Sequence, residues 1–454
     1  MAYLPPYKRH PSSTACAPTP NPPSPSLSSS LRSLSLSSPR GRGRRPRPSN
    51  KIIHATGCVS RWSPLPHFSL FPEDGDGDGD GEEPTLRLEP FPCEPIERKT
   101  GAKPLVLVAS SPGQGSSGST AAAVATIADR FLPDLLAAAE RAKAGYVTKE
   151  EELVKLSLVA RVGKVLFQSQ PNGSPVSLET LRQATKAGED GTKSQLHKLF
   201  YTNVPSECLD DMEQSMVKKM ALEFDSSKEH YHVKVWFYNA PTQSNYDLVF
   251  DKYQSDSTMS CKCTVDENGS LSIHKVSVPL SNHASASDSS MMTPFVQVEW
   301  NQVRHLVEDI SCLFKDLDLR LMLCTERILK TLDSEVENAL KSLVSSAVID
   351  PDVKGGLRWP LGKESIGDRF SIVGVWHTNY KAFRNESLRL KLRHADRFDH
   401  RSSTGEVSNE VTFKLIGMSR RLEDDDPEET SLKKMLESSV QMVWDNALNY
   451  KIAP

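Results

Sequence analysis

The chain has 454 residues and a formal net charge of −3, a length that suits two or three domains of ordinary size. Its eight cysteines are scattered along the chain, which excludes a compact disulfide framework and favours a reducing, intracellular compartment. The longest strictly apolar stretch lies near residues 121–127, far below the ~20 apolar residues that a transmembrane helix needs. The sequence therefore predicts no membrane span.

The N-terminal region has a composition that opposes folding. Residues 1–72 hold no Asp or Glu against ten Lys and Arg, and Ser and Pro dominate them. A compact basic run contributes Arg42, Arg44, Arg45 and Arg47, and an acidic Asp/Gly tract follows at 74–83. Such a segment buries too little apolar surface to balance the entropy lost on ordering. We expect a disordered basic arm over 1–83 and a folded region over 84–454.

The first part of the folded region mixes short strands and helices. A hairpin-like pair is expected at 85–88 and 104–108. A helix at 119–144 follows from the three-to-four spacing of its apolar residues, with a kink or break at Pro133. Extended structure at 153–167 bends at Gly163. Short helices at 177–186 and 206–222 each begin at a serine N-cap.

The rest of the chain is richer in strands. Strands are expected at 231–237, 246–253, 259–265, 271–278, 317–323, 370–376, 387–393 and 410–417, with Asn268-Gly269 forming a tight hairpin turn. Helices are expected at 303–314, 334–347 and 432–448, and a polar loop at 281–290 marks a subdomain seam. Runs of strands between helices favour an α+β fold with mainly antiparallel sheets packed with helices.

The first ten residues, Met1-Ala-Tyr-Leu-Pro-Pro-Tyr-Lys-Arg-His10, resemble the opening Met-Ala-Tyr-Ile-Pro-Pro-His-Lys-Arg-His of a plant family of uncharacterised proteins with a domain of unknown function. The resemblance continues through Lys51-Ile-Ile-His-Ala55, Ser60-Arg-Trp62, residues 88–98 and Lys164-Val-Leu-Phe167. The chain departs from the family at Leu4 and Tyr7. Because that family carries no known reaction, the resemblance implies an architecture and no activity.

A glycine-rich loop suggests a phosphate site, but it lacks the residues that such sites need. Gly113, Gly115 and Gly118 fit the dinucleotide-binding spacing between a strand and a helix. The stretch after the loop is helical, so the second strand with its acidic end is missing, and Ser119 stands where a phosphate-binding loop carries lysine. The sequence favours a flexible Gly/Ser loop and leaves open whether the loop binds anything.

One metal-binding arrangement can be drawn from paired ligands. His230 and His232 share one face of a strand, as do Cys261 and Cys263. If these strands were neighbours, the four side chains could form a zinc site. The favoured interpretation is that the cysteines are core residues and the histidines line a half-exposed sheet face, so we expect no cofactor.

The basic residues give the best functional indication. Leu388, Leu390 and Leu392 alternate with Arg389, Lys391 and Arg393, which predicts a basic stripe on the open face of the strand. Such a stripe could contact phosphates, although basic side chains on strands also serve solubility. The Arg-rich arm could add to the contact.

A short linear motif lies at the N-terminus. Tyr3, Pro5, Pro6 and Arg9 look like a Tyr-x-Pro-Pro-x-x-Arg segment of some RNA helicases and messenger-RNA-associated proteins. A Pro-Pro pair stiffens an extended peptide and lowers the entropy lost on docking. The pattern predicts a peptide-docking role.

The sequence therefore favours a non-enzymatic interaction protein that binds RNA or an RNA-associated protein through the arm and the basic strand. The alternative is an enzyme or metal-binding protein whose site uses the dispersed His and Cys residues. The expected compartment is the cytoplasm or nucleus; a plastid or mitochondrion is the alternative because transit peptides share the acid-free Ser/Arg composition. The sequence does not indicate the oligomeric state.

Overall fold

The computed structural model describes residues 58–65, 86–109, 120–144, 152–168, 175–190, 197–237, 257–278, 302–330, 332–367, 369–424 and 428–448. The expected strand at 246–253 and the polar loop at 281–290 lie outside these ranges. Strands that precede and follow 281–290 pair with each other: Glu223–Phe237 pairs with Phe370–Arg384, and Leu271–Val278 pairs with Asp318–Leu329.

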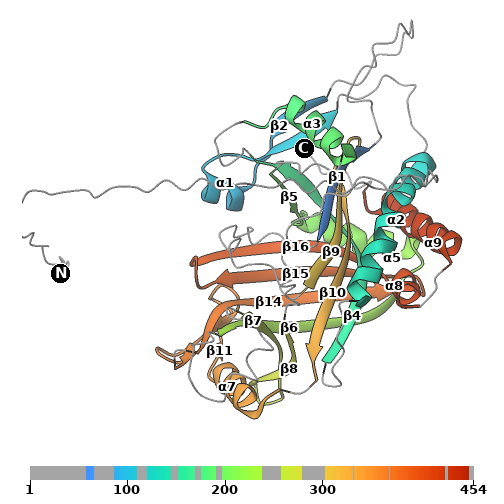
Figure 1. Cartoon of the computed structure of the whole chain (residues 1–454). Helices are drawn as coiled ribbons and strands as arrows, with labels where there is room; N and C mark the ends of the chain where they lie inside the picture. The colour runs from blue at the N-terminus through green and yellow to red at the C-terminus, as the bar shows by residue number, and fades with distance from the viewer. Residues whose placement is uncertain are drawn as a thin grey trace, which may run out of the picture. The chain divides into compact units, whose positions relative to one another are not determined.

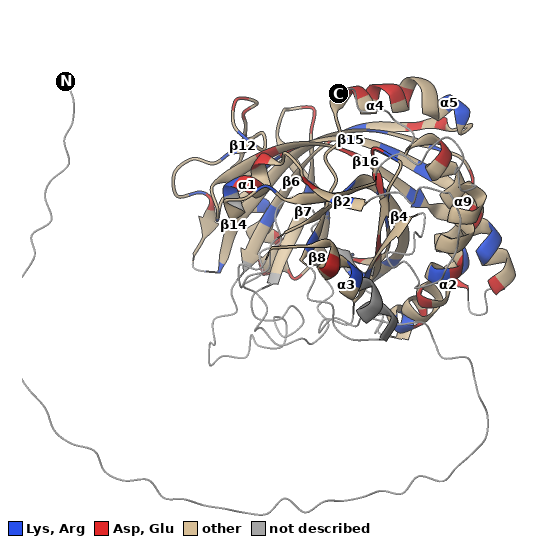
Figure 2. Ribbon diagram, turned by 90° about the horizontal axis from the view of Figure 1, so that it is seen from above, with Lys and Arg blue, Asp and Glu red and all other residues tan. Residues whose placement is uncertain are grey.

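The central feature is a sheet that closes on itself (Figure 1). Around the circle, each strand is hydrogen-bonded to the next and the last to the first. In order, these eight strands are β4 (Glu152–Phe167), β10 (Asp318–Leu329), β8 (Leu271–Val278), β7 (Ser257–Val265), β6 (Glu223–Phe237), β14 (Phe370–Arg384), β15 (Leu388–Asp399) and β16 (Thr404–Leu415). We call this closed set the ring; Figure 2 shows it from above.

Two strands extend the sheet beyond the ring. β9 (Gln302–Cys312) pairs with β10, and β1 (Val59–Leu65) pairs with β9. The β1–β9 pair is parallel, whereas the other strand pairs in the described ranges are antiparallel, so the sheet is mixed. Short strands β11 (Val348–Ile349), β12 (Leu357–Arg358) and β13 (Ser365–Ile366) lie between α7 and β14 in the chain.

β4 continues out of the ring into a smaller lobe at Gly163. Up to this residue β4 pairs with β10, and from Lys164 it pairs with β5 (Lys198–Tyr201). A Cβ atom at Gly163 would lie 2.1 Å from the backbone oxygen of Tyr201, so only glycine allows the two strands to approach. The lobe adds β2 (Leu86–Pro90), β3 (Leu105–Ala109), α1 (Glu94–Thr100) and α3 (Leu178–Asp190), all at the top of Figure 1.

Helices cover the outer face of the ring. α2 (Thr120–Ala144), α8 (Ile416–Glu423) and α9 (Glu429–Asn446) pack with the outer side chains of β4, β10, β15 and β16 in the largest core cluster. The helical segments α4 (Ser206–Asp211), η1 (Met212–Met216) and α5 (Val217–Lys219) join the same cluster. α7 (Ser334–Ser345) covers β6, β7 and β8 in a second cluster. None of the described helices is long and apolar enough to cross a membrane.

Alternation along the strands decides which side chains enter the ring. On β4, for example, Leu156, Leu158, Ala160 and Val162 belong to the outer core. Successive strand residues point to opposite faces, so Ser157, Val159 and Arg161 point inward. The outer face takes most of the leucines and valines. The inner face receives many polar and charged members of the strands, together with a small apolar cluster that includes Val159 and Met322.

Two expectations from the sequence are wrong. Residues 303–314 form strand β9 rather than a helix. The register between β9 and β10 shifts at Leu323/Cys324, and this bulge interrupts the two-residue alternation, so that the apolar positions imitate a helical period. Residues 59–65, expected in the disordered arm, form β1, in which Val59 and Leu65 are buried.

Strand β1 is fastened by a buried arginine. Arg61 forms ion pairs with Asp134 of α2 and, at 2.7 Å, with Glu308 of β9; its own side chain is 8% exposed. Arg61 also donates to the backbone oxygen of Arg130 at 3.1 Å. Ser63 donates to Glu308 at 3.2 Å. These contacts join the N-terminal strand, the longest helix and the extended sheet.

We predict that Arg61→Ala lowers the free energy of unfolding by about 3–5 kcal/mol, because it leaves two buried carboxylates without their cation. Urea unfolding monitored by circular dichroism measures this loss. Arg87→Ala is the control, since the Arg87–Glu89 pair is 65% and 42% exposed and such pairs contribute about 0–1 kcal/mol. Equal stability of the two variants would contradict the assignment.

Candidate anion-binding site inside the ring

Basic side chains gather on the inner face of the ring. Register and alternation place seven of them there, which we call the basic cluster: Lys155, Lys228, Lys262, Lys275, Arg389, Lys391 and Lys414. Among the described residues, carboxylates that pair with its members include Glu326, with Lys275 at 2.6 Å, and Asp225, with Arg389 at 2.5 Å. Cations therefore outnumber these carboxylates.

Lys262 and Lys414 face each other across the interior. Lys262 lies on β7 and Lys414 on β16, four strands apart in either direction around the ring. Burial, followed by the charges of Lys275 and Lys228, lowers the pKa of Lys262 to about 8. Burial also lowers the pKa of Lys414, and the charges of Lys155 and Arg389 act in the same direction. The positive charge of the interior thus disfavours the protonated form of both lysines.

His230 is the unusual member of this inner surface. It is 4% exposed, and both of its ring nitrogens are buried without a hydrogen-bond partner among the described residues. Burial, followed by the charges of Lys262, Lys391 and Lys228, lowers its pKa to about 4. Buried polar atoms are nearly always hydrogen-bonded. An imidazole with two unpartnered ring nitrogens is therefore a candidate ligand-binding group.

Aromatic side chains line the same wall. His232 stacks on Trp376 with ring centroids 4.5 Å apart and planes at 7°. Tyr380 lies 5.7 Å from the ring of His230, and the Lys391 ammonium sits 3.8 Å from the Tyr380 ring centroid. These contacts fix the rings and hold one lysine by a cation–π interaction.

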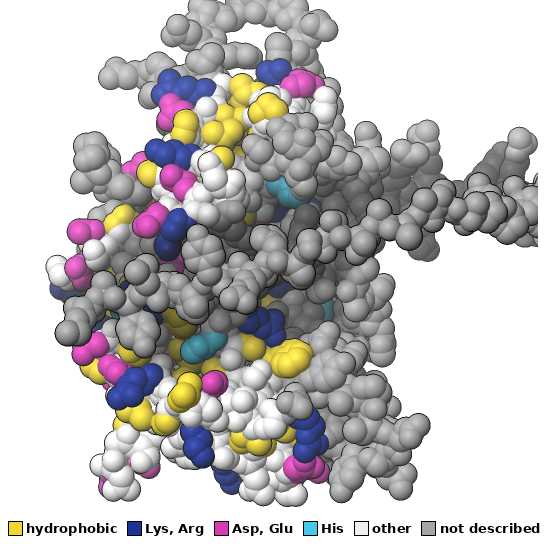
Figure 3. Space-filling view, turned by 90° about the vertical axis from the view of Figure 1, so that its left-hand side faces the viewer, with side chains coloured by type: hydrophobic (Ala, Val, Ile, Leu, Met, Phe, Trp, Pro, Cys, Tyr) yellow, Lys and Arg dark blue, Asp and Glu magenta, His cyan; other side chains and the backbone are white. Residues whose placement is uncertain are grey.

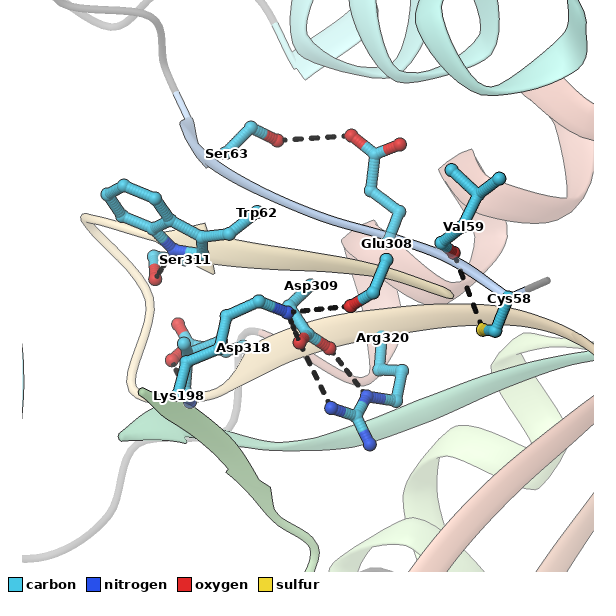
Figure 4. A network of polar contacts seen from close by, with 12 residues as sticks. Cys58, Val59, Trp62, Ser63, Lys198, Glu308, Asp309, Ser311, Asp318 and Arg320 are labelled. Atoms are coloured by element: carbon cyan, nitrogen blue, oxygen red, sulfur yellow. Dashed lines mark hydrogen bonds and ion pairs between the residues drawn. The ribbon is translucent and has the colours of Figure 1, made fainter. Parts of the chain in front are cut away.

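A second polar region lies where β5 of the lobe meets β9 and β10 (Figure 4). Asp309 accepts from Arg320 at 2.5 Å and 3.0 Å and pairs with Lys198. Arg320 lies 4.7 Å over the ring of Phe200. Although burial opposes ionisation, the two cations hold the pKa of Asp309 well below its usual range. Here both cations pair with one buried carboxylate, so the network is structural.

Glu410 has the same role further around the ring. It pairs with Arg393 at 2.5 Å and with Arg397. Against the opposing effect of burial, these two cations and Arg161 hold the pKa of Glu410 well below its usual range. Arg393 and Arg397 therefore share one buried carboxylate partner.

The structure separates the four residues of the suggested metal site. Cys261 and Cys263 pack against Tyr231 and Val233 in the outer core beneath α7. His230 and His232 alternate with those core residues and therefore face inward. The alternative of a joint His/Cys site is wrong, because neighbouring strands present these pairs to opposite faces of the sheet. No group of metal-binding side chains occurs within the described ranges.

The basic stripe is brought together but does not lie on an open surface. Arg389, Lys391 and Arg393 do share the face opposite the leucines, and that face is the ring interior. Arg393 is 7% exposed and pairs with Glu410. The expected open face is wrong because closure of the sheet turns it inward. The other sequence-predicted site residues, Arg42, Arg44, Arg45, Arg47, Tyr3, Pro5, Pro6, Arg9 and the 113–118 loop, lie outside the described residues.

A family model described as a domain of unknown function (DUF7903) matches residues 46–283 and 288–447. The chain belongs to the DUF7903 family. This match begins upstream of β1 and spans the ring, the lobe and the helices, so the whole described fold belongs to the DUF7903 domain. Among curated proteins, no sequence match is found.

Solved structures give weak similarities to the DUF7903 chain. The RNA triphosphatase Pct1 of S. pombe has a TM-score of 0.39 and 7% sequence identity, over 72% of this chain and 94% of that one. A putative adenylate cyclase from Bacillus halodurans has a TM-score of 0.22 and 11% identity, over 56% of this chain and 90% of that one. Similarities at this level support no functional inference.

Several residues of the candidate site escaped the sequence interpretation. Lys228, Lys262 and Lys275 were not singled out, nor was Asp309. A usable signal was the basic residue at every second position, as in Lys228-Glu-His230-Tyr-His232-Val-Lys234, which places Lys228, His230, His232 and Lys234 on one strand face.

We predict that acid destabilises the protein between pH 6.5 and 4 partly through His230. Because the folded pKa of about 4 lies below the ordinary 6.5, the unfolded state binds more protons in this window, and stability falls as pH falls. The full effect is roughly 3 kcal/mol. Urea unfolding at several pH values should show a shallower pH dependence for His230→Gln than for wild type. His394→Gln, at an exposed position on the outer face, should retain the wild-type dependence; identical curves for all three proteins would refute the assignment.

Proposed function

We propose that this DUF7903 protein binds a small, multiply charged phosphate compound inside the ring. The observation that carries the proposal is the basic cluster, in which seven cations meet two paired carboxylates beside the partnerless ring of His230. Burying the like charges of Lys262 and Lys414 is unfavourable unless a counter-charge is present. A phosphate ligand would supply that charge and accept hydrogen bonds from lysine, arginine and histidine.

The dimensions of the ring support a small ligand. A closed sheet of about eight strands has an interior that its own side chains fill or that holds one small ligand. Oligophosphates and phosphorylated small molecules fit that limit, and a folded or double-stranded nucleic acid does not. The expected association with RNA is compatible with this interior only for a single-stranded end.

The outer surface offers less to an anion. On the face in Figure 3, basic and acidic side chains of the described residues are interspersed. Many outer basic residues have a carboxylate partner, including Lys341 with Glu337 at 2.5 Å and Arg358 with Asp350 at 2.7 Å. The concentration of positive charge therefore favours the inner face.

The arrangement favours binding over turnover. Asp309, Glu326 and Glu410, on the inner face, are each engaged by a basic side chain. Glu406, on the same face, lies near Arg397, and burial raises its pKa. Phosphoryl transfer depends on positioned electrostatic stabilisers together with a group that orients the nucleophile. We accordingly propose a binding protein, with an enzyme assembled from His and Cys residues the less supported reading.

We predict that the purified protein binds linear tripolyphosphate with an affinity that falls as salt is added. Replacing Lys262 and Lys414 together by glutamine should lower the affinity at least tenfold, because two facing cations disappear from the interior. Isothermal titration calorimetry measures the affinity directly. Lys341→Gln with Lys434→Gln removes the same charge from α7 and α9 and should leave affinity within twofold.

Single-stranded RNA serves as the competitor that separates the two ligand classes. Displacement of tripolyphosphate by a short RNA would assign the interior to an RNA end. RNA binding that survives both the Lys262/Lys414 change and excess tripolyphosphate would place the RNA contact elsewhere. Failure of tripolyphosphate and other small phosphate compounds to bind would refute the proposal.

A further inference from the structure

The inner surface also indicates how the phosphate would be held, an inference that rests on the function proposed above. We propose that His230 donates hydrogen bonds from both ring nitrogens to the bound phosphate and takes up one proton from solvent as the ligand enters. Binding would thus be a coupled uptake of anion and proton, with no covalent step. His230 would distinguish ligands that only accept hydrogen bonds from ligands that also donate them.

The position of His230 carries this inference. Its side chain is almost completely buried on the inner face of β6, and neither Nδ1 nor Nε2 has a hydrogen-bond partner in the described part of the chain. Its backbone oxygen accepts from Thr378 Oγ1 at 3.2 Å, which holds β6 to β14 at this point. The imidazole is therefore rigidly presented with two unused polar atoms.

The groups that face His230 come from five strands. They are Lys228 and His232 on β6, Lys262 on β7, His274 on β8, Tyr380 on β14 and Lys391 on β15. No carboxylate is among these groups. Each cation repels a proton on the imidazole, so the ring is neutral in the ligand-free protein at neutral pH.

A phosphate reverses this balance. Its oxygens are acceptors, whereas a neutral imidazole presents one donor and one acceptor, so one ring nitrogen would face an oxygen lone pair. Protonation turns both nitrogens into donors and adds a charge-assisted hydrogen bond. The charge of the ligand also offsets that of the neighbouring lysines, which, after burial, are the causes that lower the pKa of His230 to about 4 in the free protein. Because the pKa of His230 rises in the complex, affinity falls as pH rises through that higher value.

The test uses cyclic trimetaphosphate, whose phosphates carry no proton that titrates between pH 5 and 8. This is the pH range in which His230 would titrate in the complex. Calorimetric titration at pH 6 in two buffers of different ionisation enthalpy gives the number of protons taken up. We expect about one proton for wild type. His230→Gln should still bind, roughly tenfold more weakly, with no proton uptake at pH 6 and no pH dependence between pH 5 and 6.5, where Lys262, with a pKa of about 8, stays charged. His394→Gln should behave like wild type.

The outcomes separate failure of the His230 role from failure of the proposed function. Binding of trimetaphosphate by wild type without proton uptake would overturn the role of His230 and leave the proposed function standing. Proton uptake that persists in His230→Gln and disappears in His274→Gln would also overturn it, by assigning the proton to the neighbouring strand. Absence of binding to trimetaphosphate and tripolyphosphate alike would refute the proposed function itself.

Discussion

Closure of the sheet is the constraint on which the rest of the structure depends. Once β10 pairs with both β4 and β8, every ring strand must send alternate side chains into a confined interior. The outer alternates are apolar and are buried by α2, α8 and α9 on one side and α7 on another. The inner alternates are largely polar or charged, so the electrostatics of the ring follow directly from its topology.

The interior handles charge in two ways. Asp309 and Glu410 each bind two basic side chains. The Asp309 group ties β5, β9 and β10 together, and the Glu410 group ties β15 to β16. Buried charges are tolerated when they are paired and hydrogen-bonded. The basic cluster departs from this pattern, since burial and neighbouring basic side chains lower the pKa values of both Lys262 and Lys414. Functional sites are where such departures are expected.

Local features of the fold could be predicted from the sequence because local rules fix them. The Asn268-Gly269 turn joins β7 and β8, and the helices at 334–347 and 432–448 correspond to α7 and α9. The helix at 119–144 also forms, unbroken by Pro133. The alternation of Leu388 to Arg393 correctly separated two faces of β15.

The site itself depended on pairings between distant segments. The sequence around Arg389 and Lys391 does not predict that their face of the strand is enclosed, because enclosure requires β10 to pair with both β8 and β4. In the same way, the opposite orientations of His230 and Cys261 follow from the register between β6 and β7. The misreading of β9 as a helix had a local cause, namely a bulge that broke the alternation. Sequence patterns thus gave the faces of single strands, and topology decided which face became the site.

The most direct measurement is the position of a heavy oxyanion in crystals of the protein soaked with tungstate, a phosphate mimic with strong anomalous scattering. The account predicts an anomalous peak inside the ring, within hydrogen-bond distance of His230 and in reach of Lys262 and Lys414. Peaks confined to the outer surface, with an empty interior at saturating tungstate, would contradict it.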